Sequence, residues 1–172
     1  MRRRLVSEGG RPWTADAAMP EESRDSAGVR VRLDRMVEEF ADLDAREKLE
    51  LLVDFANGLP ALPAEYEARK AVEDRRVHEC QTPVFLWPEM IPAGGARLVA
   101  DVAPEAPTVK GFVAVLAEAV AGRPVGEAAT LPDDILERMG LVEVLGMMRT
   151  GGLRSIVARV RRGFAELARS QA

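Results

Sequence analysis

Cysteine and histidine are almost absent from the sequence, with Cys80 and His78 the only ones among its 172 residues. A single cysteine excludes an internal disulfide framework and a cysteine-cluster metal site. A single histidine leaves no second imidazole for a metal ion. Because free thiols persist in reducing compartments, we expect a cytoplasmic location.

Long hydrophobic runs are also missing, and none approaches the roughly 20 apolar residues that a membrane-spanning helix needs. The basic start, Met1-Arg2-Arg3-Arg4, is not followed by an apolar h-region, so we expect no secretory signal. The net charge is −4, and the molecule as a whole therefore does not attract nucleic acid or an anionic membrane. We predict that it binds neither.

The chain divides into a polar start and one domain. Residues 1–28 mix Arg, Gly, Pro, Ser, Asp and Glu without an apolar period, which predicts a disordered N-terminal extension. Residues 29–170 form the predicted single domain, since a chain of this length and a hydrophobic content of 47% suit one globular core.

Apolar residues at helical spacing predict five helices, near 30–41, 44–58, 107–121, 131–139 and 152–168. The second should begin with a capping box formed by Asp44 and Glu47. Asn57-Gly58 should end it through a left-handed cap, and Gly140 should cap the fourth.

Three strands are predicted between the second and third helices, at 75–79, 84–87 and 96–102. Pro88 should end the middle strand or lie on an edge, because proline has no N–H to donate. Short turns make neighbouring strands antiparallel. Segregated strands and helices predict an α+β fold with a small three-stranded antiparallel sheet, packed on one face by helices.

Cys80 lies where a polar segment meets the apolar run Val84–Trp87. This places it on a loop or tight turn entering a strand, a common way to present a reactive group. A lone cysteine is often only a small buried hydrophobe. Its polar neighbours Glu79, Gln81 and Thr82 argue against the middle of a core segment.

Four short motifs resemble those of the SufE family, the sulfur acceptors that partner cysteine desulfurases. They occur in the family's order across about residues 33–168 and are Leu59-Pro60-x-Leu62, Cys80-Gln81-Thr82-x-Val84-Phe85-Leu86, Val109-Lys110-Gly111-Phe112 and Arg149-x-x-Gly152-Leu153. The chain departs from the family pattern at Glu79, where the family has glycine. It also departs at Thr82, where the family has serine, and at Phe85, where it has tryptophan.

The resemblance implies a SufE/IscU-like fold and a function. Cys80 would accept persulfide sulfur from a SufS-type cysteine desulfurase, stimulate that enzyme, and deliver the sulfur to an iron–sulfur scaffold complex. The protein would then be a transpersulfuration partner rather than a stand-alone enzyme. It would need no cofactor of its own, because pyridoxal phosphate would belong to the desulfurase.

Four residues are candidates to support Cys80, although each could be an ordinary surface residue. Arg149 matches a motif arginine, and a nearby guanidinium favours a thiolate. His78 would share a strand face with Cys80 and could act as a base. Gln81 could shape the loop through hydrogen bonds, and Lys110 lies in a matching motif.

Other functions remain open at this point. The main alternative is a regulatory binding partner of a desulfurase in which Cys80 carries nothing, and the negative charge of Glu79 favours it. A cysteine peroxidase or hydrolase would need a base and a third orienting group, for which the sequence offers only His78. An iron–sulfur scaffold is least favoured, since Cys80 has no companion cysteines.

Overall fold

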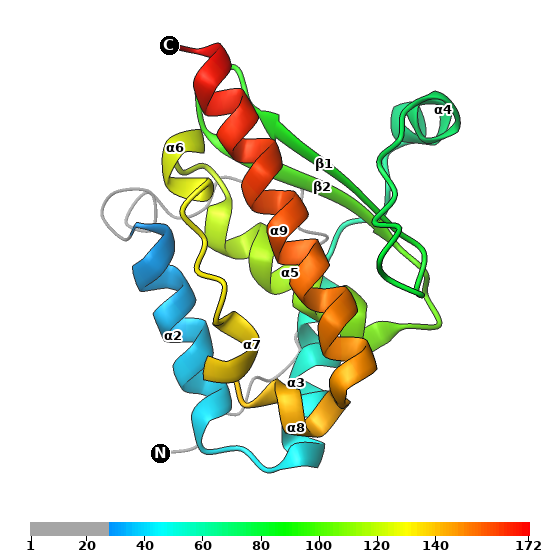
Figure 1. Ribbon diagram of the computed structural model, residues 1–172, viewed down its shortest axis with the longest axis vertical. Coiled ribbons are helices and arrows are strands. Elements are labelled where there is room, and N and C mark those ends of the chain that lie inside the picture. The colour runs from blue at the N-terminus through cyan, green and yellow to red at the C-terminus, as the bar shows by residue number, and fades with distance from the viewer. Residues whose placement is uncertain (1–27) are drawn as a thin grey trace.

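The fold contains a two-stranded antiparallel sheet, formed by β1 (Val84–Met90) and β2 (Ala96–Val102) (Figure 1). The structure is a computed structural model that describes residues 28–172. The predicted extension, apart from Gly28, therefore lies outside the described residues. Val84 pairs with Val102 and Met90 with Ala96, so the hairpin places the loop that precedes β1 beside the segment that follows β2.

The predicted first strand, 75–79, is not confirmed. Arg76 forms one isolated bridge with Phe85, flanked by hydrogen bonds from Leu86 N–H to the Arg75 carbonyl (3.0 Å) and from Val77 N–H to the Val84 carbonyl (2.9 Å). The chain turns directly after Val77, so this pairing is too short to form a strand. Residues 75–77 are called the stem below.

The predicted middle strand runs further than expected, through Pro88 to Met90. Backbone groups of alternate strand residues point to the same edge. Leu86 donates its N–H to the stem, away from β2, so the nitrogen of Pro88 also faces away from β2. The proline therefore lies on an edge of the sheet and does not end the strand. It costs the β1–β2 ladder no hydrogen bond.

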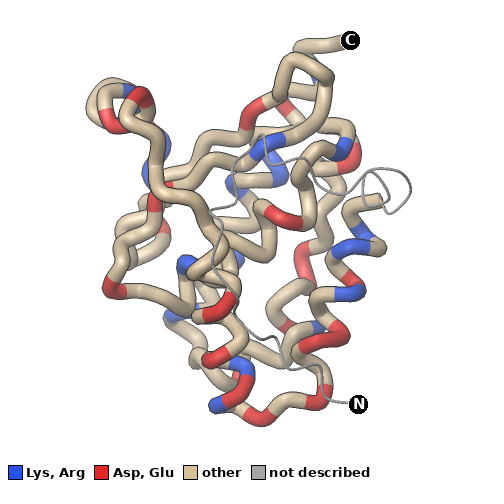
Figure 2. Tube along the Cα trace, turned by 180° about the vertical axis from the view of Figure 1, so that it is seen from behind, with Lys and Arg blue, Asp and Glu red and all other residues tan. Residues whose placement is uncertain are grey.

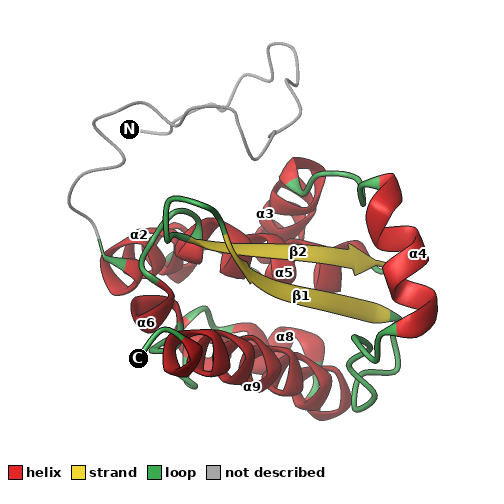
Figure 3. Ribbon diagram, turned by 90° about the horizontal axis from the view of Figure 1, so that it is seen from above, coloured by secondary structure: helices red, strands yellow, loops and turns green. Residues whose placement is uncertain are grey.

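Four helices frame one face of the sheet (Figure 3), namely α2 (Val29–Ala41), α3 (Ala45–Gly58), α5 (Pro107–Val120) and α9 (Met147–Ser170). The predicted capping box of α3 is confirmed, with Asp44 Oδ1 accepting from Glu47 N–H (2.8 Å) and Asp44 N–H donating to Glu47 Oε2 (3.0 Å). Its predicted left-handed cap is wrong, because Gly58 does not have a positive φ. The helix ends because Leu59 precedes a proline, which disfavours helical backbone.

Three short helices connect α5 to α9, and they are α6 (Val125–Ala128), α7 (Ile135–Arg138) and α8 (Leu141–Leu145). Only α7 falls within a predicted helix. Gly140 adopts φ 65° after α7, which confirms it as the cap. The last helix begins at Met147 rather than at residue 152, so Gly152 lies inside the helix instead of at its start.

The inner face of the sheet carries the core. Its buried side chains meet those of α5 and α9, and they are Val84, Leu86, Ala96, Leu98, Ala100, Val102, Phe112, Val113, Leu116, Leu153, Ile156 and Phe164. Burying apolar surface of this extent is the main favourable term in folding. Within residues 28–172, no helix is both long and apolar enough to cross a membrane.

The other face of the sheet is covered by α4 (Ala64–Val72), a helix that the sequence did not predict. Tyr66 packs its ring edge-on against Trp87 with centroids 5.2 Å apart, and Lys70 Nζ bonds Asp101 Oδ2 at 2.6 Å. The prediction of helices on one face only is therefore wrong. In Figure 2 α4 carries both acidic and basic residues, which suits attachment by ion pairs.

A close contact between α3 and α5 depends on Gly111. A Cβ built on Gly111 would lie 1.9 Å from the Leu52 carbonyl oxygen and 2.6 Å from its carbonyl carbon. Only a residue without a side chain permits the two helix backbones to approach this closely. The motif Val109-Lys110-Gly111-Phe112 thus contains a packing residue.

Candidate functional site

Cys80 lies in a loop, residues 78–83, that connects the stem to β1 and is called the cysteine loop below. Cys80 N–H donates to the Val77 carbonyl at 3.2 Å, and this forms a tight turn with His78 and Glu79 exposed at its tip. At the other end of the loop, the Pro83 carbonyl accepts from Ala103 N–H (3.1 Å) just after β2. The predicted position of Cys80, on a turn leading into a strand, is confirmed.

The thiol of Cys80 is buried against α9, with 6% of the residue exposed. A Cβ added to Gly152 would lie 3.1 Å from Cys80 Sγ and 3.3 Å from its Cα. The absence of a side chain at Gly152 therefore creates the space that the thiol occupies. Because the sulfur is covered here, the loop has to move before Cys80 can meet another molecule.

The ring of His78 forms a hydrogen bond with Asp74. Its Nε2 lies 2.8 Å from Asp74 Oδ1, and this hydrogen bond is the main cause that lowers the pKa of Asp74. The predicted shared strand face of His78 and Cys80 required a strand at 75–79 that the fold does not contain. The ring is held on the surface of the turn instead.

Of the other three predicted residues, Gln81 lies in the loop itself, Arg149 in α9 and Lys110 in α5. Gln81 and Arg149 are exposed, and neither side chain forms a hydrogen bond or ion pair with a residue in the range 28–172. Arg149 comes three residues before Gly152 on α9, so the two share a side of the helix. Lys110 is partly exposed in the first turn of α5, next to the packing residue Gly111.

Exchanging Gly152 for alanine should release the thiol. The added Cβ would press on Cys80 Sγ and Cα, whereas Gly151 has nothing within 4 Å of its own Cβ position. We expect Gly152→Ala to increase the rate of Cys80 alkylation by iodoacetamide by about tenfold, the effect of roughly 1.4 kcal/mol on a local opening. Gly151→Ala, an exposed helical site, should leave the rate unchanged and stabilise the protein slightly. Equal rates for the two variants would contradict this account.

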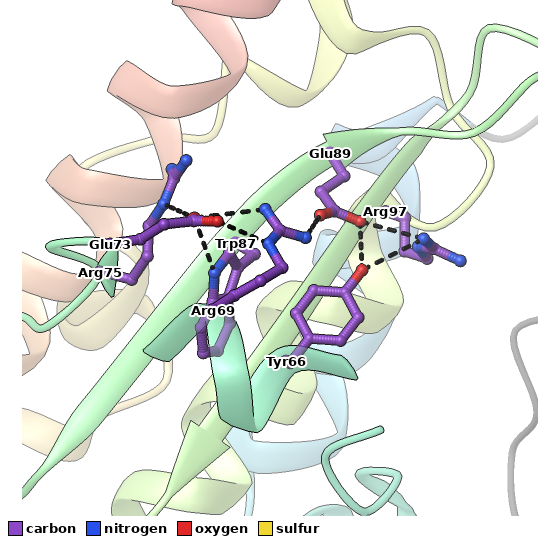
Figure 4. Close-up of polar contacts among 7 residues, drawn as sticks. All are labelled: Tyr66, Arg69, Glu73, Arg75, Trp87, Glu89 and Arg97. Carbon is purple, nitrogen blue, oxygen red and sulfur yellow. Dashed lines mark hydrogen bonds and ion pairs between the residues drawn. The ribbon is translucent and has the colours of Figure 1, made fainter. Parts of the chain in front are cut away.

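A polar network on the outer face of the sheet was missed at the sequence level (Figure 4). The Glu89 carboxylate accepts from Tyr66 OH (2.5 Å), Arg69 Nη1 (2.7 Å) and Arg97 Nη2 (3.0 Å). Burial opposes the charge of Glu89, but these three hydrogen bonds lower its pKa. In the sequence, the one sign of these polar contacts is the i, i+4 spacing of Arg69 and Glu73, which suits an ion pair on a helix.

Among the described residues, Cys80 belongs to no metal site, and it does not line the cavity between α3 and α5. In the described part of the chain, no group of three or more His, Cys, Asp or Glu side chains could hold a metal ion. A cavity of about 360 Å³ lies between α3 and α5, with Phe55, Leu59 and Ala117 in its wall. No residue of the cysteine loop lines it.

A family model described as "SufE: Fe-S metabolism associated domain" matches residues 34–164. The chain belongs to the SufE family. This confirms the resemblance seen in the motifs and associates the protein with iron–sulfur metabolism. The family match includes the cysteine loop, α5 and most of α9.

Relatives of the SufE-family chain come from several bacteria. It is 34% identical over 140 residues to an uncharacterized SufE-like protein of Mycobacterium tuberculosis, covering 81% of this chain and 96% of the relative. An uncharacterized SufE-like protein of Rhizobium etli is 30% identical over 132 residues, with 75% and 86% covered. The solution structure of a hypothetical protein from Thermus thermophilus has a TM-score of 0.66 at 30% identity, covering 78% of this chain and 94% of that one.

Proposed function

We propose that this SufE-family protein is a sulfur carrier whose Cys80 accepts persulfide sulfur from a cysteine desulfurase. The observation that carries the proposal is the setting of Cys80, a lone thiol on a turn between two anchored segments at the surface of α9. Since the chain has no second cysteine, a persulfide on Cys80 has no internal thiol to attack it. The sulfur can then be passed only to another molecule.

The reaction is an exchange at sulfur. Cys80 loses its proton, and its thiolate attacks the outer sulfur of the desulfurase persulfide. A new S–S bond forms on Cys80 while the bond to the desulfurase cysteine breaks, and the electron pair leaves with that thiolate. The transferred sulfur keeps its oxidation level, so the protein needs no redox partner or cofactor of its own for this step.

Positive charge near the opened loop would favour the thiolate, since a free cysteine has a pKa of about 8.5. Arg149 is the residue best placed for this role, as an exposed cation about one turn from the point where Cys80 contacts α9. We propose a SufS-type desulfurase, which holds the pyridoxal phosphate, as the donor and an iron–sulfur scaffold complex as the recipient. Both would meet the protein in the cytoplasm.

Intact mass after incubation with an active cysteine desulfurase and cysteine tests the proposal. Binding is first verified for the pair by calorimetry. A gain of one sulfur mass that a thiol reductant removes supports the carrier. A desulfurase that binds and turns over without leaving sulfur on Cys80 would refute it for that pair.

A regulatory role without sulfur transfer is the second candidate. Glu79 is exposed directly beside the buried Cys80, and a negative charge there disfavours a thiolate. Under this alternative the loop would stimulate the desulfurase by contact alone.

Met148 offers a way to test where the desulfurase docks. Its side chain is 78% exposed, and it precedes Gly152 by one helical turn, on the side of α9 that contacts Cys80. Exposed methionines suit protein interfaces. We expect Met148→Ser to raise the Kd for the desulfurase about tenfold, as for a moderate interface contact. Met90→Ser is the control, because Met90 lies at the end of β1 away from the cysteine loop. Similar effects of the two substitutions on the Kd would contradict docking at α9.

A further inference from the structure

The carboxylate of Glu73 joins three elements at one point (Figure 4). It follows α4 directly and accepts hydrogen bonds from Arg69 Nε (2.6 Å) and Nη2 (3.3 Å) of that helix. Arg75 Nε of the stem donates to it at 2.8 Å, and Trp87 Nε1 of β1 at 3.2 Å. The hydrogen bonds from Arg69, followed by the one from Arg75, lower the pKa of Glu73 to about 2. Glu73 is therefore charged at neutral pH, and hydrogen bonds to a charged acceptor are stronger than hydrogen bonds between neutral groups.

Between Glu73 and Cys80 the backbone is bonded at each residue of the stem. The Arg75 carbonyl accepts from Leu86, and Val77 N–H donates to Val84. The Arg76 carbonyl accepts from Arg159 Nη2 of α9 at 2.5 Å. Immediately after the stem, the loop is held by the turn bond at Cys80. The orientation of the stem therefore fixes where Cys80 can lie.

Apolar packing contributes little to holding α4 in place. Tyr66 is the one buried residue of the helix, and Val72 at its end is 83% exposed. Polar contacts must hold α4 against the sheet. One is the ion pair of Lys70 with Asp101 of β2, and the others gather at Glu89 and at Glu73. Those at Glu89 join α4 to β1 and β2, whereas those at Glu73 join α4 to the stem as well.

We propose that Glu73 is a positioning residue for the cysteine loop. By binding Arg69, Arg75 and Trp87, it holds the stem against β1 and limits how often Cys80 leaves its place at Gly152. These contacts alone support the control of the cysteine loop by Glu73. Only its consequence for sulfur transfer rests on the proposed function. Glu73 itself does not touch the reacting sulfur.

Cys80 alkylation by iodoacetamide measures the proposed control directly, since no other cysteine reacts. Glu73→Gln keeps an acceptor oxygen but loses the charge, and we expect its second-order rate to rise about tenfold, as for a local opening made easier by roughly 1.4 kcal/mol. Glu89→Gln is the matched control, because it weakens the same α4 and the same Arg69 without touching the stem. Its rate should stay within about twofold of the wild type. Circular dichroism and Tm verify that both variants are folded.

Two results would overturn the proposal. One is an unchanged alkylation rate in Glu73→Gln, and the other is an equal increase in Glu89→Gln, which would point to α4 as a whole rather than the stem. Should Glu73→Gln fail to fold, Arg75→Gln removes one bond at the stem and should raise the rate in the same direction. Because alkylation uses no desulfurase, this outcome is independent of whether Cys80 accepts sulfur.

Discussion

A Cys80→Ser variant is expected to gain no sulfur when it is incubated with an active desulfurase and cysteine, while the wild type gains one sulfur mass. A serine hydroxyl is smaller than a thiol and fits the space at Gly152, so the loop should keep its place. Serine, however, has no thiol, and its hydroxyl stays protonated near neutral pH. It therefore cannot replace the thiolate that attacks a persulfide. Desulfurase turnover should fall to the level seen without the protein, which a sulfide or alanine assay reports.

The same variant separates the two proposed functions. If contact alone stimulates the desulfurase, Cys80→Ser should stimulate it as well as the wild type does, and the carrier proposal would then fail. Glu79→Gly provides a complementary measurement, because it restores the family glycine beside Cys80. Faster sulfur acceptance by Glu79→Gly would show that the glutamate at position 79 slows a working carrier.

A Gly111→Ala variant is expected to lose much of its stability. Its new methyl group would lie 1.9 Å from the Leu52 carbonyl oxygen, and backbone on both sides leaves no flexible side chain to move aside. Overpacking of this kind typically costs about 1–3 kcal/mol, and we expect a loss of about 3 kcal/mol in the free energy of unfolding. Urea denaturation followed by circular dichroism measures it.

Gly58→Ala is the control for that loss. Gly58 is the last residue of α3, has no positive φ and has nothing within 4 Å of its Cβ position. Alanine there should change the stability by less than about 1 kcal/mol and in the favourable direction. A Gly111→Ala variant as stable as Gly58→Ala would show that α3 and α5 can separate without cost.

Elements with a strong local signal were predictable from the sequence. The capping box of Asp44 and Glu47 marked the start of α3, and the apolar stripe of α5 marked a helix that is buried over most of its length. In contrast, α4 buries only Tyr66, so it has no apolar period to detect. Its attachment depends on Glu89 and Asp101, which lie in strands about 20 to 30 residues further along the chain.

Glycine was the main source of error near the site. Gly151 and Gly152 are poor helix formers, and the prediction began the last helix only at Gly152, although α9 begins at Met147. The sequence alone does not reveal that Gly152 is needed so that Cys80 can approach the helix. Cys80 itself was found through its polar neighbours and its motif, whereas the role of Glu73 depends on contacts with residues that are brought together only by folding.

Pro88 has a consequence for how copies of this protein behave at high concentration. A strand adding to the free edge of β1 beyond Leu86 would meet a ring nitrogen where a ladder needs a donor. Gly163 of α9 also lies so close that a Cβ there would be 2.5 Å from the Pro88 ring, which shields the same stretch. The outer edge of β1 is thus a poor template for aggregation with neighbouring copies.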